Sequence, residues 1–323
     1  MQDKDFYFQL LFYVSIIGFL LNFIGLPIDY ASSFNIEHAY ELSKQSLSSW
    51  IKDYLKKLIL GGLLSCFMLV LLFVLLKNTK DDWWIYTSIL YFLISIMIAK
   101  IFPVLIIPIF YKLTPIEESP LKTKLFSLGK SLGVKILNIY NIALGKKTTK
   151  ANAAVCGIGS TKRILLSDTL LDNYADDEVE ATLAHELSHH KHHHFWKLAI
   201  MGFILTTICF FVIHIVLKRM VYSGALNSIY NIKAFPAIAI IYTVYNLLTR
   251  PVSNLISRNY EREADQDAFA ICANPLSFAT LMDKLFKQNL SDPSPSKLVK
   301  IFFYDHPPAL ERIKACRDYI KKR

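Results

Sequence analysis

Long apolar runs alternate with polar segments along this chain of 323 residues. A helix that crosses a bilayer needs about 20 predominantly apolar residues. Four runs have this length, and the core of a fifth is shorter. We therefore expect five membrane-spanning helices, with their apolar parts at residues 8–26, 58–76, 83–102, 195–217 and 234–249.

The segments that flank the first three runs carry signals of their own. Pro27 is expected to end the first helix, since proline lacks the backbone N–H that continues a helix. Residues 34–58 have apolar side chains at helical spacing among Lys and Ser, which predicts an amphipathic helix on the membrane surface or packed on a soluble domain. Trp83 and Trp84 predict an interfacial anchor for the third span. Residues 101–111 contain two prolines and are expected to form a kinked exit, not a further span.

Two polar blocks are left for soluble structure. Their patterns predict helices at residues 120–132, 258–273, 275–290 and 308–322, and strands at residues 135–143, 148–156 and 163–167. Gly133 is expected to stop the first of these helices, and residues 157–160 to form a turn. The predicted organisation is a membrane region at residues 1–113, half of a soluble domain at 114–194, two spans at 195–256 and the second half of the domain at 257–323.

Composition supports a membrane protein and argues against a nucleic-acid-binding one. The chain is 53% hydrophobic and only 19% charged, which is too apolar for a soluble protein of this length. Its net charge of +10 comes without a nucleic-acid-recognition motif, so we expect the lipid bilayer, and no nucleic acid, as a partner. Both polar blocks are rich in Lys and Arg, which predicts that they lie in the cytoplasm and that the N-terminus lies outside.

The block before the fourth span contains the sequence His-Glu-Leu-Ser-His at residues 185–189. Residues four apart share a helix face, so His185 and His189 can present two imidazoles to one metal ion with Glu186 beside it. Asp177 and Glu180 predict the N-cap and capping box of this helix. This is the arrangement of a zinc hydrolase, which needs one more protein ligand and an open position for water. A chance match on a solvated helix is the alternative.

More histidines surround the motif. His190, His192, His193 and His194 directly precede an apolar run, so we expect them to form a basic collar at the lipid headgroups; a second metal site is the alternative. His214, inside the fourth span, is expected to be a hydrogen-bonded intramembrane residue and not a ligand.

The second polar block supplies a candidate for the third ligand. Glu261 and Asp265 are four residues apart, so Glu261 can bind zinc while Asp265 accepts a hydrogen bond from a ligating imidazole. Glu263 points to another face. A distant downstream glutamate after His-Glu-x-x-His is what a gluzincin needs, and no downstream Gly-x-x-His supports the metzincin alternative. The alternative is that these charged residues simply form a solvent-exposed helix face, as such residues usually do.

With these motifs the chain resembles the integral-membrane zinc metalloendopeptidases of the type I CAAX prenyl protease group, from about Pro27 to its end. The matching motifs are at residues 147–153, 162–171, 185–197 and 305–313. The heat-shock protease HtpX shares the motif order, but the Lys-Arg-Ile-Leu-Leu and His-Pro-Pro sequences are closer to the prenyl-protease branch. We therefore predict an α-helical multi-pass membrane protein of about five spans, with a cytoplasmic, mainly helical zinc-protease domain that contains a small β-sheet.

The resemblance implies roles for individual residues. It implies that His185, His189 and Glu261 bind one Zn²⁺ and that Glu186 is the catalytic base.

It also implies functions for residues that would otherwise be unremarkable. His306 would contact the reacting carbonyl or its oxyanion, with Arg312 supporting the site. The strand around Asn152 and Ala153 would be the edge to which a peptide or protein substrate adds, C-terminally prenylated in that family.

Two departures from the family concern the substrate. The family has seven spans and we count five, and residues 154–156 are Ala, Val and Cys where the family tends to have aromatic residues. The alternatives are an HtpX-like quality-control protease and a metal-binding scaffold without hydrolysis. The Lys, Ile and Asn bias and the short membrane part suggest the inner membrane of a bacterium.

Overall fold

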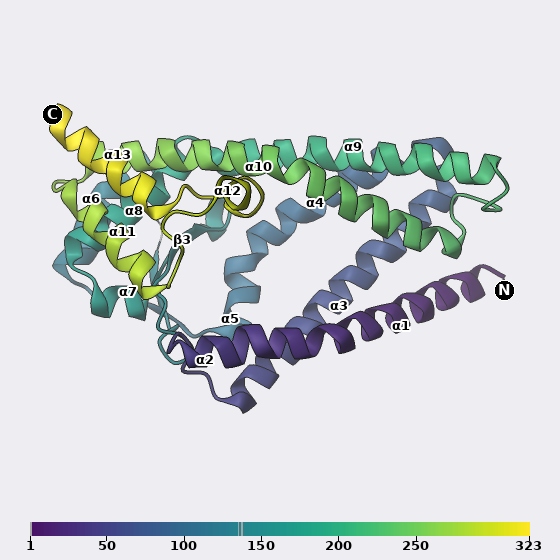
Figure 1. Cartoon of the computed structure of the whole chain (residues 1–323), viewed down its shortest axis with the longest axis horizontal. Coiled ribbons are helices and arrows are strands. Elements are labelled where there is room, and N and C mark those ends of the chain that lie inside the picture. Colours follow the sequence, from purple (N-terminus) through teal and green to yellow (C-terminus); the bar gives the residue numbers. More distant parts are fainter. Residues whose placement is uncertain (1, 135, 137) are drawn as a thin grey trace. The chain divides into compact units, whose positions relative to one another are not determined.

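The computed structural model describes residues 2–134, 136 and 138–323 (Figure 1). The chain forms two compact units, each built from two separate stretches of sequence. The first, here called the membrane unit, comprises Met1–Ser95 and Ile200–Thr249. The second, here called the sheet unit, comprises Ile96–Ala199 and Arg250–Arg323. Candidate catalytic and metal-binding residues from distant parts of the sequence therefore lie in the same unit.

The prediction of five spans is confirmed. Among the described residues, five helices are long and apolar enough to cross a membrane: Phe6–Ala39, Leu47–Asn78, Lys80–Phe110, His194–Tyr222 and Ile232–Ile271. Their most apolar windows are only 0–28% buried by protein. A helix with this many exposed apolar side chains needs lipid around it, because water would leave a large apolar surface unsatisfied.

The expected end of the first helix at Pro27 is wrong. Helix α1 (Gln2–Tyr30) runs through Pro27, and a π-helical segment (Ala31–Ile36) and the short α2 (Glu37–Ala39) follow it. In lipid no water is available to satisfy an opened backbone, so a helix persists past a proline that would end it in water.

The single amphipathic helix expected at residues 34–58 is also absent. The chain breaks after Ala39, and α3 (Leu47–Asn78) begins anew with Ser46 as its N-cap, whose Oγ accepts a hydrogen bond from the Ser49 N–H. The periodic pattern therefore belongs to the ends of two spanning helices. Serine at the N-cap favours a new helix start here, because its side chain satisfies one of the backbone N–H groups that have no partner in the first turn.

The third span ends in the kinked exit that its prolines predicted. Helix α4 (Trp83–Ile101) continues into a π-helical segment (Phe102–Ile106) and α5 (Ile107–Phe110). Trp83, however, is not an interfacial anchor, because its side chain is fully buried in the membrane unit. Its Nε1 donates to His214 Nδ1 at 3.1 Å, so the expectation that His214 is a hydrogen-bonded intramembrane residue is confirmed.

The sheet unit contains a four-stranded mixed sheet in the order β1-β2-β4-β3. Its strands are β1 (Leu113–Pro115), β2 (Ile139–Ile142), β3 (Ala153–Cys156) and β4 (Arg163–Ser167). Strands β2 and β4 are parallel, and the other two pairs are antiparallel. Consequently β3 is an edge strand.

The predicted strands differ in how well they match this sheet. The strand predicted at residues 163–167 is confirmed. Only the last four residues of the segment 148–156 are a strand, because Asn152 is the last residue of a loop that reaches the sheet. Only residues 139–142 of the segment 135–143 are a strand, and residues 135 and 137 lie outside the described part of the chain. Strand β1 was missed, since three residues carry no readable alternation.

Helices surround the sheet in this unit. They are α6 (Pro120–Ser131), α7 (Asp168–Asn173), α8 (Asp176–Lys191), α11 (Leu276–Gln288), α12 (Lys297–Phe303) and α13 (Ala309–Lys322). All of them except α12, which has no buried residue, contribute side chains to the core of the unit. Helix α6 stops where Gly133 adopts a φ of +69°, as predicted. The short α7 and α12 were not predicted. Buried residues of α8, including Leu183 and Leu187, pack in one core with Phe269 and Phe278.

The capping of α8 differs from the prediction by two residues. The N-cap is Ala175, whose N–H donates to Glu178 Oε2 at 2.9 Å. Asp177 instead accepts a hydrogen bond from Lys124 Nζ at 2.7 Å, and Glu180 forms an ion pair with the same atom at 2.8 Å. The acidic run offers several carboxylates for the cap, and the ion pairs with Lys124 of α6 hold two of them away from the N-terminus of the helix.

The fifth span and the first helix of the last polar block are one element. Helix α10 (Phe235–Ile271) is continuous through Pro251, so the separate helix expected at residues 258–273 is wrong. Its second half carries Arg258, Glu261 and Asp265, all buried in the sheet unit. The second half of a continuous helix therefore carries the candidate third ligand.

Candidate metal site and active-site cavity

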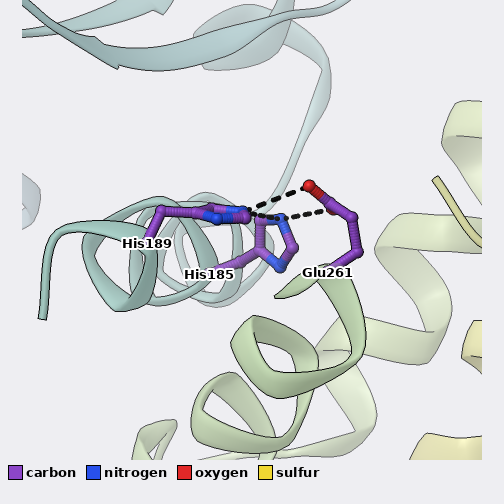
Figure 2. Close-up of side chains that lie close together, drawn as sticks. All are labelled: His185, His189 and Glu261. Carbon is purple, nitrogen blue, oxygen red and sulfur yellow. Dashed lines mark hydrogen bonds and ion pairs between the residues drawn. The ribbon is translucent and has the colours of Figure 1, made fainter. Parts of the chain in front are cut away.

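Three potential ligand atoms converge between α8 and α10 (Figure 2). His185 Nε2 lies 3.2 Å from His189 Nε2 and 3.2 Å from Glu261 Oε2. His189 Nε2 lies 3.3 Å from Glu261 Oε1. The four-residue spacing on α8 stacks the two imidazoles, and the continuous α10 brings the carboxylate to them.

This donor set fits tetrahedral zinc. Zinc bonds to histidine nitrogen and carboxylate oxygen are about 2.0–2.1 Å long, so ligand atoms of a tetrahedral site are about 3.3–3.4 Å apart. The observed separations of 3.2, 3.2 and 3.3 Å are close to that value. Glu261 Oε2 is also buried without a hydrogen bond of good geometry from any described residue, which costs free energy unless a cation is bound. Two facing imidazole nitrogens and a carboxylate cannot all satisfy one another, but one cation satisfies all three.

His185 is oriented by a second carboxylate. Its Nδ1 lies 2.9 Å from Asp265 Oδ1, and Arg312 holds Asp265 through two hydrogen bonds, Nη2 to Oδ1 at 2.6 Å and Nε to Oδ2 at 2.9 Å. Burial lowers the pKa of His185, but the hydrogen bonds with Asp265 and Glu261 outweigh burial and raise the pKa to about 9. The site therefore stabilises positive charge at this imidazole. With Nδ1 donating to Asp265, the lone pair of Nε2 faces Glu261 and His189.

The histidines beyond the motif do not form a collar. His194 is only 1% exposed, and its Nδ1 lies 2.9 Å from His189 Nδ1. Its Nε2 lies 3.1 Å from Glu263 Oε2. His192 bridges Glu263 and Asp267, at 3.0 and 2.9 Å. Sequence reasoning missed these partners because it placed Glu263 on another helix face, although a histidine five residues after a ligand was a usable signal.

A cavity of about 130 Å³ adjoins the metal site within the sheet unit. Its lining includes His185, Glu186, Asn152, Ala153 and Arg312. The carboxylate-bearing Glu186 thus faces the same space as the residues expected to hold substrate. Apolar side chains of α11 form another part of the wall, namely Phe278, Leu281, Met282 and Leu285.

His306 also lines this cavity, from the loop between α12 and α13. Its Nε2 lies 3.4 Å from Glu261 Oε1, and its Nδ1 lies 2.9 Å from Asp305 Oδ1. The hydrogen bond with Asp305 raises the pKa of His306, which favours the protonated ring. A half-exposed imidazolium beside the third ligand can donate a hydrogen bond to negative charge that develops in the cavity.

The edge strand β3 borders the cavity. The Asn152 carbonyl accepts from the Ser167 N–H at 2.9 Å, so the alternation of an antiparallel pair directs the backbone groups of Ala153 away from β4. Beyond it, the backbone of Val155 is bonded to the side chain of His190, whose pKa is lowered to about 4, by burial and secondarily by Lys162. The described edge is therefore open at Ala153 and occupied at Val155.

A His-Glu-x-x-His helix, a distant glutamate and an adjoining cavity in a multi-span chain define the class of membrane-embedded zinc metallopeptidases. The chain belongs to peptidase family M48, whose model matches residues 115–320. Residues 1–112 match the N-terminal region of CAAX prenyl proteases, described as having five membrane helices. Only three of the candidate spans of this chain, Phe6–Ala39, Leu47–Asn78 and Lys80–Phe110, lie in that region.

Individual relatives agree with the family assignment. The uncharacterized metalloprotease YhfN of Bacillus subtilis is 28% identical over 313 residues, covering 95% of this chain and 73% of the relative. CAAX prenyl protease 1 of Saccharomyces cerevisiae is 29% identical over 334 residues, covering 98% and 73%. The crystal structure of S. mikatae Ste24p matches with a TM-score of 0.87 and 26% identity, covering 95% of this chain and 75% of that one. The chain is a multi-pass membrane zinc metalloprotease of the CAAX prenyl protease type, as predicted.

Proposed function

We propose that this protein hydrolyses peptide bonds at a single zinc ion held by His185, His189 and Glu261. The observation that carries the proposal is the triangle of donor atoms, with sides of 3.2, 3.2 and 3.3 Å, next to a cavity that Glu186 lines. Asp265 and Arg312 hold the first imidazole in the orientation that a ligand needs.

The side chains around the cavity have separate tasks in this mechanism. Bound zinc lowers the pKa of a water to about 7 and polarises the substrate carbonyl. The carboxylate of Glu186 accepts the proton of the attacking water and returns it to the leaving amine. Nε2 of His306 donates to the oxygen on which negative charge develops, a contribution of about 3 kcal/mol for comparable donors.

The substrate is an extended peptide or protein segment. The free backbone groups of Ala153 can pair with one more strand, because β3 is at the edge of the sheet and borders the cavity. Asn152, the preceding residue, also lines the cavity. His190 covers the next position, at Val155, so the pairing is short. Apolar side chains of α11 favour apolar residues next to the cleaved bond.

A C-terminal prenyl group on the substrate is the finer proposal. Its support is the set of relatives that bear the name CAAX prenyl protease 1. We further propose that the sheet unit faces the cytoplasm and the N-terminus the outside of a bacterial inner membrane. The support is the Lys and Arg content of the polar blocks and the compositional bias of the chain.

The test uses the full chain, purified in detergent, with its zinc content and its cleavage of fluorogenic peptides measured together. Matched prenylated and unprenylated peptides are compared for the wild type and Glu186→Gln. Zinc in both proteins with cleavage by the wild type alone supports the proposal, and the ratio between the two peptides tests the prenyl group. Undiminished cleavage by Glu186→Gln, or zinc binding without cleavage of either peptide by the wild type, would contradict it.

A further inference from the structure

The two imidazoles of the proposed zinc site have different hydrogen-bond partners at Nδ1. His185 is held by Asp265, as the four-residue spacing from Glu261 predicted, whereas no carboxylate of the described residues lies at Nδ1 of His189. The atom that faces His189 Nδ1 is Nδ1 of His194, at 2.9 Å. His194 in turn reaches Glu263 Oε2 through Nε2, at 3.1 Å.

Proton positions along this chain of contacts follow from the metal site. If His189 Nε2 binds zinc, its proton must be on Nδ1. This N–H then donates to His194 Nδ1, which must be unprotonated to accept it. The remaining proton of His194 is on Nε2 and donates to Glu263. Each hydrogen bond has one donor and one acceptor, so the carboxylate fixes the tautomers of both rings.

The local fold places His194 firmly. It is the first residue of α9 and follows His193, whose φ of +56° is in the left-handed region that non-glycine residues rarely adopt. The ring of His194 stacks on Tyr260 of α10, with centroids 4.4 Å apart and planes 14° apart. A buried ring held by stacking and by two polar contacts has little freedom to turn.

Glu263 is held as well. His192 Nδ1 lies 3.0 Å from Glu263 Oε1, while its Nε2 reaches Asp267. Asp267 also accepts from Ser188 Oγ at 3.0 Å and from Lys191 Nζ at 2.7 Å. These contacts join the C-terminal end of α8 to the face of α10 that carries Glu263 and Asp267.

We propose that His194 and Glu263 are positioning residues, which orient His189 for zinc through a His189–His194–Glu263 relay. The proposal rests on the proposed zinc site. It assigns a role to a glutamate other than the third ligand and to a histidine outside the motif. A loss of 10- to 100-fold in metal affinity, roughly the effect of removing a group that orients a ligand, is the expected consequence of breaking the relay.

The experiment measures the zinc dissociation constant by competition with a fluorescent chelator, on the full chain in detergent. His194→Ala removes the acceptor for His189, and about 10- to 100-fold weaker binding is expected. His194→Asn keeps an acceptor oxygen near the Nδ1 position, so it should recover most of the affinity. His193→Asn is the matched control, since it alters an exposed histidine next in sequence and tolerates a positive φ.

A second pair of variants covers the case that His194→Ala does not fold. Glu263→Gln keeps an acceptor for His194 Nε2, whereas Glu263→Ala removes it, so Ala should weaken zinc binding more than Gln. Cobalt-substituted protein adds a spectroscopic readout, because a changed ligand geometry alters the visible absorption bands of Co²⁺ but a remote packing defect does not.

The outcomes separate this inference from the proposed function. No zinc binding by the wild type would contradict the zinc site itself. Tight binding by the wild type and equal binding by His194→Ala or Glu263→Ala would overturn the relay alone. An Asn variant that loses as much affinity as the Ala variant would also overturn it, because the effect would then not depend on the hydrogen bond.

Discussion

The two units of this protein both have an apolar core, but they differ in the polar side chains that they bury. In the membrane unit the buried polar side chains among the described residues are Thr87, Ser88 and His214, and none is a carboxylate or a guanidinium. In the described part of the sheet unit five charged side chains are buried, Glu178, Glu180, Arg258, Glu261 and Asp265. Buried charge is costly unless it is paired, so a fold retains it where function needs it.

The two units also gain their stability from different surroundings. The membrane unit leaves most of its apolar surface to lipid and packs a small core around Trp83, Phe73 and Phe210. The sheet unit has a larger apolar core of its own and uses it to hold polar groups next to a cavity. Substitutions of polar groups should therefore affect catalysis or zinc in the sheet unit and only local packing in the membrane unit.

The largest effect is expected for Glu186→Gln. The substitution removes the proton acceptor but keeps the size of the side chain, so kcat should fall by about 10²- to 10⁴-fold. Zinc content and thermal unfolding temperature should stay at the wild-type values. Peptide cleavage and metal analysis of the same preparation check this, and a large loss of zinc would show that Glu186 is part of the metal site instead.

Arg312→Leu should have the next largest effect, on stability. It leaves the buried carboxylate of Asp265 without its bidentate partner, and removing one member of a buried pair costs about 3–5 kcal/mol. Lys287→Met is the control, because it breaks the exposed pair with Asp283 and should cost about 1 kcal/mol or less. Denaturant unfolding in detergent measures both, and equal losses would contradict the distinction between buried and exposed charge.

His306→Ala should lower kcat by about 10²- to 10³-fold, since it removes one hydrogen-bond donor to the oxyanion. Zinc affinity should change little, because His306 lies 3.4 Å from Glu261 without being a ligand in the proposal. Steady-state kinetics with the fluorogenic peptide give the answer. A raised KM with unchanged kcat would assign His306 to substrate binding instead of transition-state stabilisation.

Trp83→Phe should have the smallest effect and tests the membrane unit. An aromatic ring remains, but the hydrogen bond from Nε1 to His214 is lost and the smaller ring leaves a void in the core, at a combined cost of about 2 kcal/mol. The unfolding temperature should fall slightly, while kcat and zinc content remain unchanged. A loss of activity at full zinc occupancy would show that the two units do not divide stability and catalysis in this way.

Much of this structure could be predicted from local sequence patterns. The apolar runs identified all five spans, because length and hydropathy are properties of short segments. The same is true of residues 185–189, where a four-residue spacing is enough to bring two imidazoles onto one helix face. Two local signals gave wrong helix boundaries. Pro27 predicted the end of a helix that continues to Tyr30, and the pattern at residues 34–58 predicted one helix where a new helix begins after Ser46.

Sequence patterns were enough to predict the spans, the motif helix and the pairing of Glu261 with Asp265 on one face of a second helix. Three features became visible only in the folded chain: which carboxylate caps α8, that α10 is one continuous helix, and that His194 reaches His189 while Glu263 reaches His194. Spacing along a helix sets which side chains share a face. Packing between helices sets which of these faces meet, and a hydrogen bond over 69 residues of chain, from His194 to Glu263, depends on the second alone.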